Sequence, residues 1–330
     1  MTANLLLLTR TDIERLLDFP TCIAAVEDAF RRRAEGRAAP SGVLGVHVAE
    51  GGFHVKAAAL ELERPFFAAK VNANFPGNPA QHGLPTIQGV LVLFDAARGE
   101  PLAMMDSASI TTLRTAAASA VAARHLARRG ARTMTIVGCG VQARAHVAAM
   151  RAVHSLDQIA VFDLDVPAAK RFAAEMRALH GVSVTAADDL ARATLASDVI
   201  VTCTPSRAAF LGTAHVAPGA FIAAVGADNE QKQEIEPALL RASAVVVDDL
   251  EQCATMGDLH HAIEAGVMSR SDIRATLGEV IAGRRPGRRD PHEIVVFDST
   301  GVALEDVAAA ADVWTRARAE GAGLPVALAG

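Results

Sequence analysis

The chain of 330 residues contains no tyrosine, and only four of its 32 basic residues are lysines. Without a phenol, no tyrosine can act as an acid or base in a reaction of this protein. The lysines are Lys56, Lys70, Lys170 and Lys232, so most positive charge comes from arginine. Lys70 interrupts the apolar run PFFAAKVNANF, where burial of an unpaired charge would be costly, and it therefore needs an explanation.

Cysteine is also scarce, and the four cysteines are too scattered to indicate a disulfide framework or a zinc site. His260 and His261 are adjacent, so they would point to different helix faces, and no metal is expected. No run reaches 18 apolar residues, and no basic segment precedes the leucines near the N-terminus, which argues against a membrane span or signal peptide. The net charge of −5 argues against a nucleic-acid partner. These absences predict a cytoplasmic protein.

The middle of the chain alternates short runs rich in β-branched residues with alanine-rich segments of helical periodicity. Seven runs are expected strands: 133–138, 158–163, 182–186, 198–203, 220–226, 244–249 and 293–299. Such alternation is typical of a parallel, doubly wound sheet flanked by helices. The sequence therefore predicts an α/β fold, with this domain over residues 130–305.

Residues 1–129 follow a different pattern. Residues 11–36 have helical periodicity with Thr11 as a candidate N-cap, and the strand-like runs that follow are broken by Gly, Pro and Asn. These runs favour an antiparallel sheet in an α+β domain. The alanine-rich helix expected at 108–130 would bridge the two domains, and residues 306–330 would return to the first.

A glycine-rich loop, IVGCGVQARAH, follows the first strand of the parallel sheet. Gly138, Gly140 and Ala143 form a G-x-G-x-x-A motif, in which the glycines permit a tight turn and close approach of a pyrophosphate to a helix N-terminus. Asp163 ends the next strand, 20 residues after Ala143, where an acid binds the ribose hydroxyls of NAD. A carboxylate there would repel the 2′-phosphate of NADP, so NAD is expected. Strand-ending glycines and a turn residue at Asp163 are the structural alternatives.

The segment from Lys70 to Ser119 carries the motifs GLPT, MMDS and LRTAA, and FDSTGVALED lies near the C-terminus. With the glycine loop, these motifs resemble the ornithine cyclodeaminase/mu-crystallin family. The resemblance implies a Rossmann domain for NAD, a substrate-binding and dimerisation domain built from both chain ends, and a homodimer. It also implies hydride exchange between NAD(P) and the α-carbon of an amino or imino acid.

The resemblance also assigns roles to individual residues. It implies that Lys70 and Arg114 grip the substrate carboxylate, that Thr86 lies near the nicotinamide, and that Asp228 is the catalytic aspartate, with Lys70 also in the catalytic set. The remaining residues expected to bind the cofactor are Thr115, Val141, Gln142, Thr204, Ser206, Lys232, Ser299 and Thr300.

Elementary chemistry supports the main roles independently. A guanidinium and an ammonium suit a planar carboxylate. Asp228 follows a strand at the sheet edge where such folds bind ligands, and it can exchange a proton with an amine, an imine or water. A surface arginine and a plain loop acid are the alternatives for Arg114 and Asp228.

One departure from the family pattern concerns a third carboxylate ligand. Many members carry an arginine about 28 residues before the lysine, and this chain has Gly42 at that position. The offset is approximate, because the register of the strands is not fixed by the sequence. His54 and Lys56 share one strand face at i, i+2. We hypothesise that Lys56, helped by His54, replaces the missing cation or binds a second acidic group of the substrate. An exposed sheet face is the alternative.

This departure bears on the substrate. A lysine would repel the distal amine of ornithine, near which ornithine cyclodeaminases are expected to place an acid. The sequence therefore ranks reduction of an imino acid (a ketimine), or oxidation of a small or acidic amino acid, above conversion of ornithine to proline and ammonia. A crystallin-like protein that binds NAD(P)H without turnover is the alternative of another class.

Overall fold

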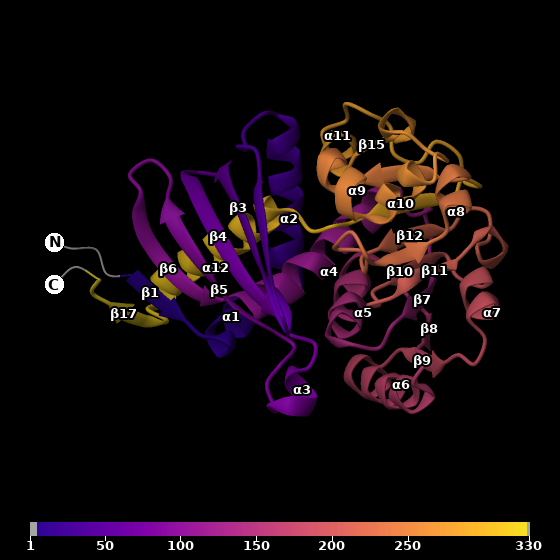
Figure 1. The fold of residues 1–330 in the computed structure, drawn as a ribbon, viewed down its shortest axis with the longest axis horizontal. Helices are drawn as coiled ribbons and strands as arrows, with labels where there is room; N and C mark the ends of the chain where they lie inside the picture. The colour runs from indigo at the N-terminus through magenta and orange to yellow at the C-terminus, as the bar shows by residue number, and fades with distance from the viewer. Residues whose placement is uncertain (1–4, 329–330) are drawn as a thin grey trace. The chain divides into compact units, whose positions relative to one another are not determined.

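The computed structural model describes residues 5–328 and divides into two compact units (Figure 1). Unit 1 comprises Met1–Arg114 and Val302–Gly330, and unit 2 comprises Thr115–Gly301. The first boundary falls inside helix α4 (Ser107–Leu126), whereas the sequence placed it after residue 129. The roles that the sequence assigned to the two parts stay predictions.

Unit 2 contains an eight-stranded sheet in which every pairing is parallel, in the order β15-β14-β16-β12-β10-β7-β8-β9. Its strands are β7 (Thr133–Val137), β8 (Gln158–Phe162), β9 (Ser183–Ala186), β10 (Val199–Thr202), β12 (Phe221–Ala224), β14 (Ala244–Val247), β15 (Ala275–Thr276) and β16 (Val295–Asp298). The seven expected strands are all present, and the central ones, such as β10, β12, β14 and β16, are buried on both faces. The expected strands missed the two-residue β15 and a small sheet of β11 (Arg207–Leu211) and β13 (Gln233–Ile235).

The helices of unit 2 alternate with these strands. They are α5 (Val141–Val153), α6 (Val166–His180), α7 (Leu190–Leu195), α8 (Pro237–Arg241), α9 (Leu250–Met256), α10 (Asp258–Glu264) and α11 (Leu277–Ile281), with short 3₁₀ turns η1 (Thr213–His215) and η2 (Arg270–Asp272). The strand order reverses at β7, which has β8 on one side and β10 on the other. In doubly wound sheets such a reversal marks the ligand site, at the carboxyl ends of the strands.

Unit 1 contains a seven-stranded sheet in the order β17-β1-β6-β5-β4-β3-β2. Its strands are β1 (Leu5–Leu8), β2 (Gly42–Val48), β3 (Gly51–Glu61), β4 (Pro65–Asn74), β5 (Ile87–Asp95), β6 (Glu100–Asp106) and β17 (Leu324–Val326). The pairings are antiparallel as expected, except that β1 runs parallel to β6.

The helices of unit 1 are α1 (Arg10–Leu16), α2 (Phe19–Ala34), the short α3 (Asn78–Gln81) and α12 (Ala303–Glu320). Helices α2 and α12 pack together, and α12 lies along β3 and β4 (Figure 1). Thr11 is not the N-cap that the sequence suggested, because Thr9 caps α1 in a reciprocal pair with Asp12. Within residues 5–328, none of the helices combines the length and apolar character needed to span a bilayer.

Candidate functional site

Lys70 lies on the buried face of β4, with only 3% of its surface exposed. Alternate residues of a strand face opposite sides of the sheet, and Lys70 shares its side with the buried Ala68 and Phe66. Its cross-strand neighbour on β5 is Leu91, which is fully buried. The structure therefore confirms that the lysine interrupts a core face.

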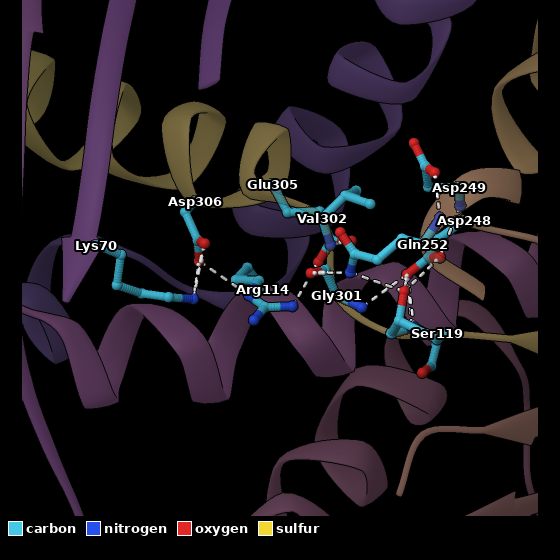
Figure 2. Close-up of polar contacts among 12 residues, drawn as sticks. Lys70, Arg114, Ser119, Asp248, Asp249, Gln252, Gly301, Val302, Glu305 and Asp306 are labelled. Carbon is cyan, nitrogen blue, oxygen red and sulfur yellow. Dashed lines mark hydrogen bonds and ion pairs between the residues drawn. The ribbon is translucent and has the colours of Figure 1, made fainter. Parts of the chain in front are cut away.

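Helix α12 supplies the counter-ions of both predicted carboxylate ligands (Figure 2). Lys70 Nζ lies 2.8 Å and 2.7 Å from the two carboxylate oxygens of Asp306. Arg114, from α4, donates through Nε to Asp306 Oδ1 at 3.0 Å and through Nη1 to Glu305 Oε2 at 2.9 Å. All four side chains are buried, so two cations and two anions form one ionic cluster inside unit 1.

The predicted binding of a substrate carboxylate by Lys70 and Arg114 stays a prediction. The burial of Lys70 itself is explained by Asp306, which lies 236 residues further along the chain and is its counter-ion in the structure. The sequence contained one signal for it, because Glu305 and Asp306 are adjacent acids in the otherwise apolar segment VALEDVAAAA. Acids in a first helical turn are usually explained by the helix dipole, which conceals such a role.

Burial shifts the protonation equilibria of the cluster. The pKa of Lys70 falls to about 7, because burial and the neighbouring Arg114 disfavour its charge more than Asp306 restores it. Burial alone would raise the pKa of Asp306, but Lys70 and Arg114 lower it overall. The pKa of Arg114 is raised by the two carboxylates in spite of burial, so the guanidinium stays charged.

Lys56 and His54 lie on the same face of β3 as predicted, beside this cluster. Lys56 is the direct cross-strand partner of Lys70, and His54 is the partner of Asn72. The charge of Lys56 lowers the pKa values of both Lys70 and Asp306. Lys56 is therefore a third cation in this region, after Lys70 and Arg114.

Gly42, the position to which the offset pointed, lies at the start of β2. Gly42 pairs with Ala57, so it lies on the opposite face of the sheet from Lys56 and Lys70. Val43 is the residue that pairs with Lys56. Neither position carries a cation, so the absence of the expected arginine stands.

Thr86 lies just before β5, where its carbonyl oxygen accepts a hydrogen bond from the backbone of Phe75 at 2.8 Å. Its side chain is half-buried, in a surface segment that includes the exposed Leu84. Its predicted place near a nicotinamide stays a prediction.

In unit 2 the glycine loop fits a dinucleotide. Gly138 has φ +95°, and a Cβ there would lie 3.0 Å from the carbonyl oxygen of Cys203, so glycine is required where β7 and β10 meet. Gly140 is the N-cap of α5 and provides no side-chain cap, while Ala143 is fully buried. Gly140 has no side chain to cap the first N–H groups of α5, so it leaves them available to an anion at this helix N-terminus. Val141, 67% exposed, and Gln142 open the same helix.

Asp163 closes this loop from the neighbouring strand. Its Oδ2 accepts a hydrogen bond from the backbone N–H of Cys139 at 2.9 Å, and its Oδ1 accepts one from Asp165. The carboxylate therefore lies directly beside the glycine loop, at the end of β8. The chemistry of these residues fits NAD, and their assignment to its pyrophosphate and its adenosine ribose stays a prediction.

Asp228 lies in the loop after β12, at the carboxyl edge of the sheet. Its side chain is 52% exposed and forms an ion pair with Lys232 Nζ at 2.7 Å. The carbonyl oxygen of Lys232 in turn accepts a hydrogen bond from His261. The structure thus brings the predicted catalytic acid and the predicted cofactor-binding lysine into contact.

The other predicted cofactor residues differ in how they are engaged. Thr204 Oγ1 bonds Glu234, and Ser206 Oγ bonds the carbonyl of Ala208. Thr300 is buried and donates from both its backbone and its hydroxyl to Asp248, so its side chain has a structural partner. Ser299 and Thr115 are also buried, at 3% and 7% exposure, and all of these assignments stay predictions.

The two adjacent histidines do not diverge as the sequence suggested. Their ring centroids are 5.1 Å apart, and with Glu264 they form a group of side chains close enough to hold a metal ion. Each histidine also has a protein partner, since His260 contacts Glu264 at 3.4 Å and His261 bonds the Lys232 carbonyl. The argument from divergent helix faces was therefore wrong, and the predicted absence of a metal stays a prediction.

Comparison with known proteins decides the family. The family model of the ornithine cyclodeaminase/mu-crystallin family matches residues 3–321. The chain belongs to this family. A solved archaeal alanine dehydrogenase dimer with bound NAD has a TM-score of 0.94 at 36% identity, with 99% of this chain and 100% of that chain covered.

Two imino acid reductases are also similar to this family member. The Δ1-pyrroline-2-carboxylate reductase of Thermococcus litoralis, solved with NADH and L-proline, has a TM-score of 0.92 at 32% identity, covering 98% and 100% of the two chains. The iminosuccinate reductase of Paracoccus denitrificans is 35% identical over 272 residues, which cover 82% of this chain and 81% of that one.

Proposed function

We propose that this member of the ornithine cyclodeaminase/mu-crystallin family is an NAD-dependent oxidoreductase that interconverts an imino acid and the corresponding amino acid. The observation that carries the proposal is the convergence of Lys70 and Arg114 on one oxygen of Asp306, at 2.8 Å and 3.0 Å. These two cations are thus already arranged to bind a carboxylate. The relatives that reduce imino acids support the same reading.

Each unit has its own task in this proposal. Lys70 and Arg114 bind the α-carboxylate of the substrate, which orients its α-carbon and neutralises its charge. When NAD is bound at the glycine loop, its nicotinamide supplies or accepts the hydride. Asp228, at the carboxyl edge of the sheet, supplies the proton to the nitrogen or removes it, directly or through water.

Lys56 supports a small or acidic substrate. A third cation beside Lys70 favours a substrate with a second acidic group and disfavours one with a distal amine. Iminosuccinate, the compound named for the Paracoccus relative, carries two carboxylates. We therefore place a dicarboxylic or small imino acid ahead of ornithine.

The assembly proposed is a homodimer. The face of the unit 1 sheet opposite α12 exposes Leu44, Val46, Phe53, Val71 and Val90, each between 37% and 58%. An apolar patch of this kind is typical of an interface between protein chains. The archaeal relative was solved as a dimer, and the mass of the protein in solution tests the proposal.

The function is tested by an assay panel with the purified protein. NADH oxidation is followed with 2-oxo acids plus ammonia or methylamine, with cyclic imines and with iminosuccinate, while ammonia release from ornithine is measured separately. Turnover with an imino acid is expected. Release of ammonia from ornithine with no net change in NADH would instead show a cyclodeaminase. Tight NADH binding without any turnover would show a binding protein.

Replacing Lys56 with alanine is expected to raise KM for an acidic imino acid and to move the alkaline limb of kcat/KM to higher pH. Attraction of the carboxylate by Lys70 is present below its pKa of about 7 and is lost as pH rises through that value. Because Lys56 lowers the pKa of Lys70, its removal raises that pKa. The measurement is a pH profile of kcat/KM, with the exposed Lys170→Ala as control. Unchanged kinetics on the best substrate would contradict the role of Lys56.

Replacing Asp163 with serine is expected to lower the preference for NADH over NADPH by about tenfold or more, a change of about 1.4 kcal/mol. The carboxylate beside the glycine loop would no longer repel a 2′-phosphate. The ratio of kcat/KM for the two cofactors is measured. Asp165→Ser is the matched control, since Asp165 lies two residues away and caps α6. An unchanged ratio in Asp163→Ser would remove Asp163 from the ribose site.

A further inference from the structure

Glu234 of β13 is a fully buried carboxylate in unit 2 to which the sequence assigned no role. Its two oxygens accept four hydrogen bonds. Oε1 accepts from the backbone N–H and the hydroxyl of Thr204, both at 2.7 Å. Oε2 accepts from the Thr202 hydroxyl at 2.7 Å and from the backbone N–H of Gly226 at 2.8 Å.

These four donors come from the ends of two parallel strands. Thr202 ends β10 and Thr204 lies in the loop that follows, whereas Gly226 lies in the loop after β12. Asp228 follows two residues after Gly226, and its backbone N–H donates to the Gly226 carbonyl at 3.0 Å. One side chain therefore ties together the loop that carries the catalytic acid and the loop that begins at the switch point of the sheet.

The packing around Glu234 leaves no room for a side chain at Gly226. A Cβ added at Gly226 would lie 2.4 Å from Glu234 Cδ and 2.4 Å from the carbonyl oxygen of Thr204. The backbone of Glu234 is also fixed, because its N–H and that of Ile235 both donate to Asp258 Oδ1, at 2.8 Å and 2.9 Å. Desolvation by burial raises the pKa of Glu234, and the four donors oppose that shift.

We infer that Glu234 is a positioning residue, which fixes Asp228 and the Thr204 loop in the geometry that NAD binding and proton transfer require. The inference rests on the proposed function, since it concerns the same reaction. Glu234 itself is buried beneath the loops and acts through them. A buried carboxylate that satisfies backbone donors from two loops is a rigid support, and small displacements of reacting groups cost rate steeply.

The test uses Glu234→Gln in the full-length protein. A glutamine amide presents N–H groups to at least one donor that Glu234 now satisfies, so the loops must move apart. The expected result is a fall in kcat of tenfold or more and a several-fold weaker Kd for NADH. The KM for the imino acid is expected to stay within about twofold, because its carboxylate ligands lie in unit 1.

Asp198→Asn is the matched control. Asp198 is also a buried carboxylate of unit 2, and it accepts hydrogen bonds from the backbone N–H groups of Arg132 and Thr133 at 2.7 Å and 3.0 Å. It lies just before β10, at the amino edge of the sheet, away from Asp228. This variant is expected to lower Tm while kcat and the Kd for NADH stay unchanged.

A Glu234→Gln protein that loses Tm like Asp198→Asn but keeps kcat and NADH affinity would overturn the inference. If that variant does not fold, Thr202→Val removes a single hydroxyl donor from Glu234 and is expected to change the same parameters in the same direction by a smaller factor. An unaltered Thr202→Val protein would then overturn it. If the wild-type protein shows no turnover, the proposed function fails, and the Kd for NADH still tests the support given to the Thr204 loop.

Discussion

Asp228→Asn is expected to lower kcat by roughly 10²- to 10⁴-fold, the contribution of a positioned general acid or base. The amide keeps the shape of the side chain but can neither release nor accept the proton at the substrate nitrogen. Because the carboxylate is half exposed, its replacement leaves no buried charge, and the free energy of unfolding is expected to change by about 0.5 kcal/mol or less.

The measurement separates chemistry from binding. Steady-state rates with a saturating imino acid report kcat, single-turnover rates report the chemical step, and titration of the variant with NADH reports cofactor affinity. Glu230→Gln is the matched control, because Glu230 is an exposed acid two residues further along the same loop. A value of kcat within about twofold of the wild type in Asp228→Asn would exclude Asp228 as the catalytic acid.

Arg114→Met is expected to cost about 3–5 kcal/mol in the free energy of unfolding, because it removes the guanidinium from two buried carboxylates. Glu305 loses its 2.9 Å contact with the guanidinium, while Asp306 keeps its ion pair with Lys70. The same variant is expected to raise KM for the imino acid, since one of the two carboxylate ligands is gone.

Denaturant titrations of four proteins test this prediction. The double variant Arg114→Met/Glu305→Gln is expected to be more stable than Arg114→Met, because the buried charge of Glu305 is removed together with the guanidinium that it contacts. Arg15→Met is the control, since the Arg15–Glu320 pair is about half exposed and its loss should cost 1 kcal/mol or less. A loss in Arg114→Met no larger than in Arg15→Met would show that the cluster contributes little to stability.

Much of the parallel sheet could be predicted because its signals are local. Most of the β-branched runs are buried on both faces, although the edge strand β9 is partly exposed, and the runs alternate with amphipathic helices, so composition over a few residues defines the element. The glycine loop and Asp163 also have local signals, because their geometry is fixed by one turn and the neighbouring strand. The seven expected strands were therefore correct to within one or two residues at each end.

The ionic cluster could not be predicted from such local signals. Strand alternation indicated that Lys70 faces the core, but it could not show what covers that face. Asp306 reaches Lys70 from a helix 236 residues further along the chain. The periodicity of a helix indicates which side is buried but not what that side contacts. The residues around Lys70 therefore do not predict Asp306, and those around Asp306 do not predict Lys70.

By itself, the sequence determined the α/β fold class, the glycine-rich loop and the family whose resemblance implies roles for Lys70, Arg114 and Asp228. Only the tertiary structure decided that Asp306 and Glu305 neutralise the two buried cations, that Lys56 lies directly across from Lys70, and that Glu234 ties the Asp228 loop to the Thr204 loop. The physical reason is the same in each case. Buried charges and polar groups must find partners wherever the fold brings them, and those partners lie in segments that the chain connects only through its packing.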